Sequence, residues 1–249
     1  MSVPNHAGRR FFLRGLFAAA LGAATLLSSL GLRAADDVLA RVRDVYATLQ
    51  TYGDSGTVVV DYGTGSRDRY TFATAIARAP RGFYFDFRKD NGDRYVIWGD
   101  PDAYHTWWKT TGVQEDYPNP NNVGAFGTAG AQTAGAAMKI PTLWYAKANL
   151  QGPFTNLADV ALEGEEQIGD RNCYRLKGKT ADAYGATGRR VNARTVTVWV
   201  DTESLLIRRI VEVPDNVLPG HVDRTTTTFE PTANGALDAG QFRFKPPEP

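Results

Sequence analysis

The sequence predicts an α+β protein that is mainly β: a curved antiparallel sheet of about eleven strands, an N-terminal helix and a helical or loop lid on the concave face. Apolar residues recur at helical spacing over residues 36–50, and beyond Gly53 they alternate with polar residues in short runs. The links between the first runs are too short for parallel connections, so the strands are expected to be antiparallel. Residues 36–249 are therefore predicted to form one large domain.

The composition excludes several classes of protein. With 43% apolar residues, 25 Gly, 13 Pro and one Cys, the chain is neither disordered nor collagen-like, and it is not a disulfide-stapled mini-domain. The net charge is +1, but residues 1–34 hold four Arg and no acidic residue, so the remaining 24 basic and 27 acidic residues carry a net charge of −3. Nucleic acid is not an expected partner, because phosphate binding needs clustered cations.

Residues 1–35 have the basic, apolar and small-residue regions of an export signal. An apolar run over residues 15–32 leads to an expected cleavage near Ala34 or Ala35 and to a periplasmic location. An uncleaved membrane anchor is the alternative, since about 18 apolar residues are near the lower limit for spanning a bilayer. The residues that resemble the twin-arginine export pattern are Arg9, Arg10, Phe12, Leu13 and Arg14.

One helix and five strands are expected before residue 110. Apolar positions over residues 36–50 give an amphipathic helix. Asn91-Gly92 is a hairpin signal between two of the strands. The five strands are predicted at residues 57–62, 70–76, 83–88, 94–98 and 103–108.

The alternation stops between residues 110 and 156. Pro, Asn and Gly mark loops there, while residues 129–138 suit a short helix of small residues. Long insertions between strands are usually functional, so this segment is predicted to be a lid. Six further strands are expected at residues 158–167, 173–179, 195–200, 205–213, 222–229 and 241–244.

The predicted sheet has more apolar surface than its helix can cover. Eleven strands would span roughly 50 Å if flat, whereas the helix is only about 22 Å long. Closure of the sheet, the Gly/Ala-rich segment 124–147 or a bound apolar ligand must hide the rest. The alternative is a well-filled core without a vacancy.

A hydrophobic binding site is the functional prediction from this mismatch. The wall is expected to carry Val58, Val60, Phe72, Phe83, Phe85, Phe87 and Trp107. The lid is expected to contribute Met138, Ile140, Leu143 and Trp144. These assignments rest on strand alternation, and an error of one residue moves a side chain to the other face.

The order of elements resembles the LolA and LolB family of periplasmic lipoprotein-handling proteins. The segments that carry the resemblance are residues 45–52, 78–83, 169–176, 199–201, 205–209 and 242–247. It implies an unclosed antiparallel barrel whose apolar concavity is plugged by helices and holds acyl chains or other hydrophobic groups. The chain departs from LolB in having no lipidation Cys, and from LolA in its twin-arginine leader.

The function implied is a carrier or chaperone of the periplasm, with a hydrophobic small molecule or acyl chain as ligand. The alternative is a non-catalytic sensor or adaptor of the cell envelope that binds a membrane protein, as RseB-like relatives do.

Residues with catalytic or metal-binding chemistry are sparse, so we expect no enzyme activity, cofactor or metal. His105 and His221 have no metal-site spacing, and Glu163 with its neighbours is interpreted as a solvated acidic face. Cys173 lies on the same strand side as Arg175 and opposite Tyr174, and it is interpreted as an inert strand cysteine. The alternative is a partly exposed thiol whose pKa nearby cations lower.

Overall fold

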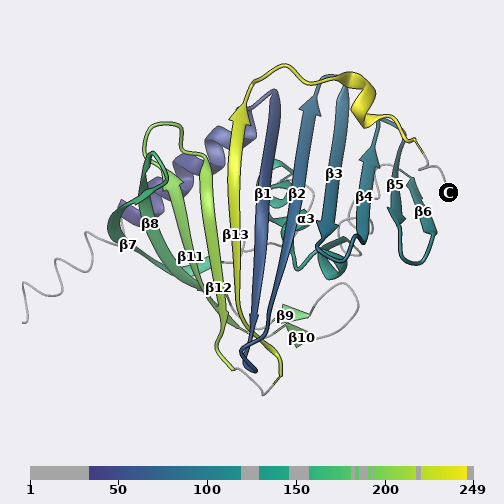
Figure 1. Cartoon of the computed structure of the whole chain (residues 1–249). Coiled ribbons are helices and arrows are strands. Elements are labelled where there is room, and N and C mark those ends of the chain that lie inside the picture. The colour runs from purple at the N-terminus through teal and green to yellow at the C-terminus, as the bar shows by residue number, and fades with distance from the viewer. Residues whose placement is uncertain are drawn as a thin grey trace, which may run out of the picture.

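A computed structural model describes residues 34–118, 129–145, 157–180, 183–184, 190–191, 193–216 and 220–245. The chain forms one strongly curved sheet with a helix over residues 34–48 lying across one of its faces (Figure 1). The strands before residue 120 are β1 (Thr51–Tyr62), β2 (Arg67–Arg78), β3 (Arg81–Lys89), β4 (Arg94–Gly99), β5 (Ala103–Trp108) and β6 (Val113–Pro118). The later strands are β7 (Leu157–Ile168), β8 (Arg171–Thr180), β9 (Ala183–Tyr184), β10 (Arg190–Val191), β11 (Arg194–Asp201), β12 (Ile207–Pro214) and β13 (Val222–Ala233).

Eleven strands form the main sheet in the order β6-β5-β4-β3-β2-β1-β13-β12-β11-β8-β7, and β9 pairs with β10 separately. Each neighbouring pair is antiparallel. The two outermost strands do not pair with each other, so the sheet remains open. The predicted fold class and the unclosed curved sheet are confirmed.

One predicted strand is wrong and one strand of the main sheet was not predicted, so the main sheet still has the expected eleven strands. Residues 113–118, assigned to the insertion, form β6. Residues 241–244 were predicted as a strand. The first two of them belong instead to the 3₁₀ helix η2 (Ala239–Phe242), and the other two follow it. The polar sequence of β6 hid its strand character, because an edge strand that faces solvent does not need apolar alternation.

The helix over residues 34–48 buries one apolar stripe against the concave face of the sheet. Val38, Leu39 and Val42 are nearly inaccessible and belong to the same core cluster as the concave strand residues. The Tyr46 hydroxyl accepts a hydrogen bond from the backbone N–H of Ile207 at 3.1 Å, which fixes the helix to β12. This helix was predicted two residues further along the chain, over residues 36–50.

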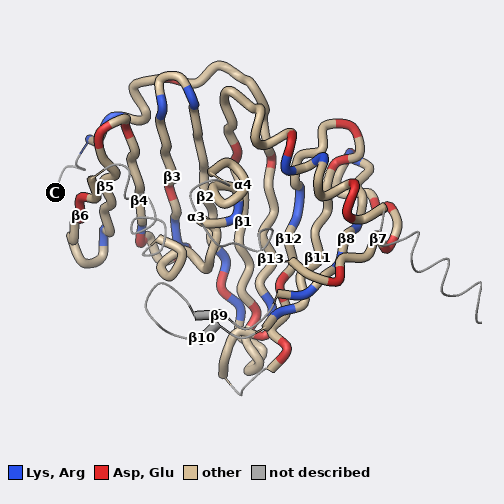
Figure 2. Tube along the Cα trace, turned by 180° about the vertical axis from the view of Figure 1, so that it is seen from behind, with Lys and Arg blue, Asp and Glu red and all other residues tan. Residues whose placement is uncertain are grey.

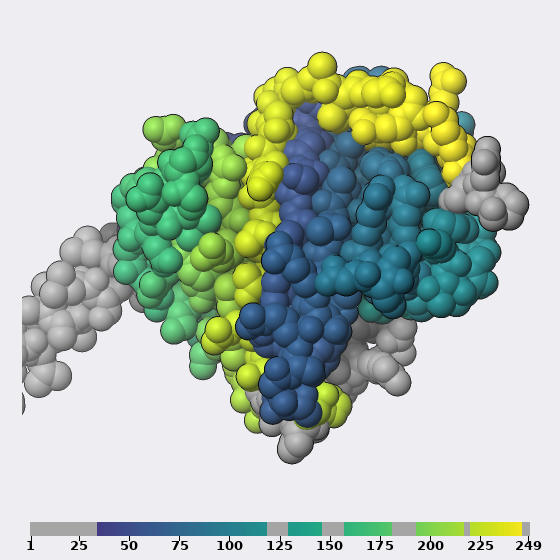
Figure 3. Space-filling model, in the orientation of Figure 1, coloured from purple at the N-terminus to yellow at the C-terminus, as the bar shows by residue number. Residues whose placement is uncertain are grey.

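The last described segment crosses one end of the convex face, as the yellow residues in Figure 3 show. There Phe242 packs on Ala75 and Ala77 in a second, small cluster. Gly82 lies directly beneath Phe242, and a Cβ at this position would come within 2.5 Å of the ring. The glycine therefore makes room for the aromatic side chain.

None of the helices in the described part of the chain combines the length and the hydropathy needed to span a bilayer.

Candidate functional site: the concave wall and its lid

Apolar side chains form a continuous row across five strands of the concave face. Directly opposed residues of neighbouring strands share a face. The register pairs Phe72 with Phe87, Phe87 with Tyr95, Tyr95 with Trp108 and Trp108 with Val113. This row, which we call the apolar row, runs from the buried centre of the sheet to its β6 edge.

The aromatic rings of the neighbouring row close the centre of the wall. Phe85 stacks on Phe72 with ring centroids 5.8 Å apart and lies 6.4 Å from Phe87. Phe83 contacts Tyr104 at 6.2 Å. Offset aromatic packing of this kind adds to the free energy gained by burial.

The structure brings together all but one of the predicted site residues. The residues of this set that are buried in the main core cluster are Val58, Val60, Phe72, Phe83, Phe85, Phe87, Ile140, Leu143 and Trp144. Met138 is half-buried against the same cluster. The expectation that Trp107 joins them is wrong: its register partner is Val96, which in turn pairs with Asp86 on the convex face. Trp107 was placed one residue out of phase, and its neighbours Thr106 and Trp108 face the concavity.

The described lid, residues 129–145, lies over the concave face of β1–β3, as the rear view shows (Figure 2). The single helix predicted over residues 129–138 is broken. A helical turn over residues 129–132 is followed by Ala134 and Gly135 at positive φ, then by α3 (Ala136–Lys139) and α4 (Pro141–Trp144). The side chains packed into the main core are Ala129, Ala136, Ala137, Ile140, Leu143 and Trp144.

One buried ion pair ties the lid to β12. Lys139 of α3 is 2% exposed and its Nζ contacts the carboxylate of Glu212, which is 6% exposed. Arg194 of β11 approaches the other oxygen of Glu212 at 3.6 Å. Burial alone raises the pKa of Glu212, but the charges of Lys139 and Arg194 outweigh it and lower the pKa below its ordinary value. Glu212 is therefore ionised between two cations. We call these three residues the buried ion cluster.

A second cation holds the other end of the lid. The Arg78 guanidinium lies 4.3 Å from the ring centroid of Trp144. Its Nε and Nη2 donate to the carbonyl oxygens of Leu49 and Tyr46 at 2.7 and 3.0 Å. These carbonyls lie at the C-terminal end of the helix over residues 34–48, where a positive charge is favourable. Arg78 thus connects strand, helix and lid.

A pocket of about 230 Å³ lies where the lid meets the open edge of the sheet. Its apolar lining comes from Tyr95, Trp108 and Val113, the outer half of the apolar row, and Gln132 of the lid covers it. Val113 is 50% exposed, although it continues a row that is otherwise buried or half-buried. Burial of Tyr95 raises the pKa of its phenol to about 12, so the hydroxyl is neutral at physiological pH. The pocket is therefore the solvent-accessible end of the wall.

Beneath the helix, a second buried carboxylate, in addition to Glu212, faces the concavity. Asp54 of β1 is buried and accepts a hydrogen bond from the Tyr52 hydroxyl at 2.7 Å. The Tyr52 ring packs 5.7 Å from that of Tyr46. Burial raises the pKa of Asp54 to about 6, more than the hydrogen bond from Tyr52 lowers it.

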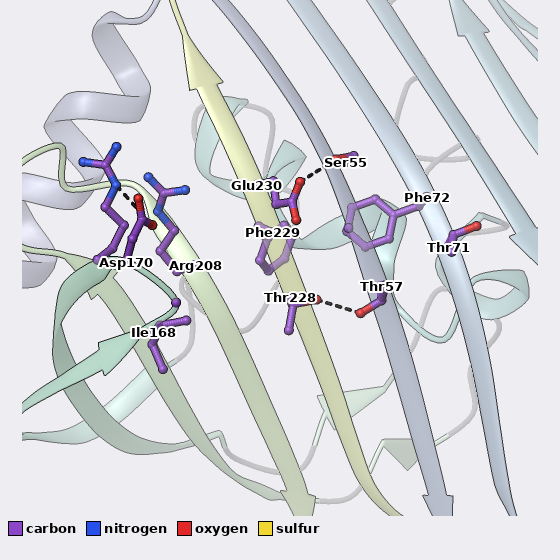
Figure 4. Close-up of a pocket in the computed structure, with 13 residues that line it drawn as sticks. Ser55, Thr57, Thr71, Phe72, Ile168, Asp170, Arg208, Thr228, Phe229 and Glu230 are labelled. Atoms are coloured by element: carbon purple, nitrogen blue, oxygen red, sulfur yellow. Dashed lines mark hydrogen bonds and ion pairs between the residues drawn. The ribbon is translucent and has the colours of Figure 1, made fainter.

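A polar groove of about 530 Å³ lies where β12 diverges from β13 (Figure 4). The hydroxyls of Thr57 and Thr228 form a hydrogen bond of 2.7 Å, and the Ser55 hydroxyl donates to the Glu230 carboxylate at 3.3 Å. Arg208 and the turn between β7 and β8 line the opposite side. Phe72 of the predicted binding wall and Phe229 also line this groove.

Two of the residues considered for catalytic or metal-binding chemistry, His105 and Glu163, are engaged in structural contacts. His105 pairs with Asp116 at 2.7 Å, and Glu163 accepts from Arg175 at 2.8 Å. Cys173 agrees with the interpretation as an inert strand cysteine and not with the alternative of a partly exposed thiol: the side chain is buried, and burial together with the charge of Asp201 raises the pKa of its thiol. No cluster of three or more metal-ligating side chains occurs within the described residues.

No family model and no curated protein matches the sequence. Among solved structures, the chain is similar to the lipoprotein LppX of Mycobacterium tuberculosis, with 10% identity, 82% of this chain and 98% of that chain covered, and a TM-score of 0.47. It is similar to LprF of Mycobacterium bovis at 11% identity, with 83% and 95% covered and a TM-score of 0.43. A LolA superfamily protein of Nitrosomonas europaea matches at 9% identity, with 84% and 97% covered and a TM-score of 0.33. Because these TM-scores lie below 0.5, the function proposed below rests on the geometry of this chain.

Proposed function

We propose that the protein binds a lipid, an acyl chain or another hydrophobic group along its concave wall, as a non-enzymatic carrier or chaperone. The observation that supports this proposal is the apolar row, which continues from the buried Phe72 to the half-exposed Val113 in the pocket beneath the lid. An extended apolar chain that enters at Val113 can follow the aromatic and aliphatic side chains of this row, while Thr106, Thr111 and Glu115 supply polar lining at the entrance. Each 100 Å² of apolar surface removed from water stabilises such a complex by about 2.5 kcal/mol.

The composition of the lid suits a segment that a bound guest can displace from the wall. Its contacts with the wall are made by Ala side chains and a few larger apolar residues, and its helical segments are single turns. Helices of this length are not stable by themselves and depend on tertiary contacts. A guest that replaces the contacts of Ile140 and Leu143 with the wall therefore shifts the lid without unfolding the sheet.

Export to the periplasm is part of the proposal, with a signal that ends at Ala34 or Ala35; residues 1–33 lie outside those the structure describes. Ala35 is fully buried in the main core cluster. Of the two predicted cleavage positions, the one after Ala34 retains this contact and is the one we propose.

The proposal is tested by native mass spectrometry and lipid extraction of the gently purified protein, together with titration of the fluorescent apolar probe N-phenyl-1-naphthylamine. Gln132→Trp is expected to fill the pocket and to weaken probe binding at least about fivefold, because the indole occupies the space of the guest. The matched control is Gln114→Trp, which places the same side chain on exposed β6, on the face opposite Val113.

Acyl-chain mass on the purified protein, together with a probe affinity lowered by Gln132→Trp but not by Gln114→Trp, is the expected result. An empty protein that binds no probe contradicts the carrier. If Gln132→Trp and Gln114→Trp changed the probe affinity equally, the guest would have to bind outside the pocket beneath the lid.

A second candidate, an envelope sensor or adaptor that binds a membrane protein, is favoured by the polar groove. β12 pairs with β13 only as far as Thr228, so residues 229–233 of β13 pair with β1 alone in the described part of the chain. A free strand edge beside a groove suits an extended segment of a partner. An empty protein that isolates one envelope protein, and loses it on Thr228→Lys, is the result expected of an adaptor.

A further inference from the structure

The buried ion cluster has a net charge of +1. Lys139 and Arg194 contribute two positive charges, Glu212 contributes one negative charge, and the pKa of Glu212 is held low. The salt bridges of the described residues give neither cation a second acidic partner. Excess charge in an apolar site is costly unless a counter-charge or water accompanies it.

The surroundings of the cluster belong to the concave wall. The register places Glu212 between Val196 of β11 and Thr225 of β13, and Thr225 opposite Val60. All three of these neighbours are buried. The cluster is thus a charged spot on an otherwise apolar surface.

Arg194 is the member of the cluster that reaches solvent. Its side chain is 35% exposed, whereas those of Lys139 and Glu212 are almost fully covered. The Arg194 Nε is buried and donates to no acceptor among the described residues. A guanidinium with an unused donor next to a buried ammonium is a favourable partner for a carboxylate or phosphate.

We propose that Lys139 and Arg194 form the headgroup site for an anionic amphiphile whose apolar chain lies on the concave wall beneath the lid. This inference rests on the proposed function and assigns it a ligand class. An anionic headgroup makes the cluster electrically neutral, while Glu212 keeps both cations in place. The lid itself connects the two ends of the site: Gln132 at the pocket and Lys139 at the cluster are seven residues apart, at most about 25 Å along the chain. Because this segment consists of helical turns, the two ends lie closer together than that limit, and a long acyl chain can reach from one to the other.

The test uses competition against N-phenyl-1-naphthylamine with three ligands of equal chain length: hexadecanoate, hexadecyl phosphate and neutral 1-hexadecanol. The two anions are expected to displace the probe at a concentration about tenfold lower than the alcohol, the factor given by one charge-assisted hydrogen bond. A difference between the two anions identifies a carboxylate or a phosphate headgroup as the preferred source of the charge.

Two substitutions are expected to move this preference in opposite directions. Arg194→Gln makes the cluster neutral and reduces the preference for the anions to about threefold or less, since only Lys139 remains and Glu212 already pairs with it. Glu212→Gln leaves both cations without a carboxylate and increases the preference. The control is Arg175→Gln, which removes a cation from an exposed pair outside the concave wall and leaves the preference unchanged.

Equal displacement by the alcohol and the anions overturns the headgroup site while the carrier stands. Failure of all three ligands to displace the probe, or of the probe to bind, overturns the carrier itself. Because Glu212→Gln leaves Lys139 buried without its partner and can impair folding, the half-exposed Arg194→Gln alone decides the inference: an unchanged preference in this folded variant contradicts it.

Discussion

The concave and convex faces of this sheet come from alternating residues of the same strands, yet different interactions stabilise them. On the concave face of β3, Phe83, Phe85 and Phe87 pack in the main core cluster. Between them on the convex face, Asp86 is held by Arg88 and Arg94, each at 2.8 Å. The concave face depends on packing and the convex face of this strand on paired charges.

This difference between the two faces indicates which of them binds a ligand. Asp86 on the convex face is matched by two arginines, whereas the concave face holds one carboxylate with a raised pKa and a cluster with excess positive charge. Buried groups that are imperfectly neutralised are typical of sites that bind ligands. The comparison therefore favours the concave face as the binding surface, and substitutions on the two faces should differ in size and in sign.

The largest difference is expected between Phe85→Ala and Trp107→Ala. Phe85 is almost fully buried, so its removal leaves a cavity and lowers the free energy of unfolding by about 3–5 kcal/mol. Trp107 is half-buried on the convex face, and its loss should cost about 1 kcal/mol. Urea denaturation measures both. Equal losses would show that the convex face is packed as tightly as the concave one.

The next largest effect is expected in the pH dependence of stability, through the titration of Asp54. Its pKa of about 6 in the folded protein exceeds that of the unfolded chain, 3.8, so folding is favoured most when the carboxyl is protonated. The stability it contributes is complete below pH 3.8 and is lost as the pH rises through about 6. Asp54→Asn removes this loss, and its stability relative to the native protein should rise between pH 4 and pH 7.5 by up to about 3 kcal/mol.

Urea denaturation across this pH range tests the change at Asp54. A constant difference between Asp54→Asn and the native protein would mean that the carboxyl does not titrate between these values. Tyr52→Phe, which removes the hydroxyl donor, is the companion variant: it should raise the pKa of Asp54 further and move the loss to higher pH.

Asp86 on the convex face should respond to pH with the opposite sign. Burial raises its pKa, but hydrogen bonds from Arg94 and Arg88 outweigh burial and lower the pKa below 3.8. Its stabilising contribution is therefore present above pH 3.8 and is lost as the pH falls through the lowered value. Asp86→Asn should cost about 1–3 kcal/mol at pH 7 and less at pH 3. A loss that grows on acidification would contradict this assignment.

The parts of the molecule that follow a strict period could be predicted from the sequence. Phe83, Phe85 and Phe87 alternate without interruption, and each lies on the wall as expected. The Trp107-Trp108 pair offers two aromatic residues in adjacent positions, so alternation alone does not decide which one faces inward. Only the register with β4, through Tyr95 and Trp108, resolves the phase.

The buried ion cluster could not be predicted, because long-range topology creates it. Lys139, Arg194 and Glu212 are each ordinary charged residues in the sequence, where a solvated position is the usual expectation. They meet only because β11 and β12 pair and because the lid folds back onto that part of the sheet. A lysine within the apolar run from Ala136 to Leu143 was the one local sign of a buried charge.

The smallest effect is expected at the exposed ion pairs, and it sharpens the comparison of charges on the two faces. Arg175 contacts Glu163 at 2.8 Å and Glu166 at 3.4 Å, but its side chain is 42% exposed. Arg175→Gln should leave the urea midpoint unchanged within error at 0.5 M NaCl, because water and salt screen such pairs. Glu212→Gln, measured under the same conditions, should lower the midpoint with little dependence on salt, because ions do not reach the covered Lys139. If salt rescued Glu212→Gln as well, Lys139 would have to be accessible to solvent ions, and the lid would be open for much of the time.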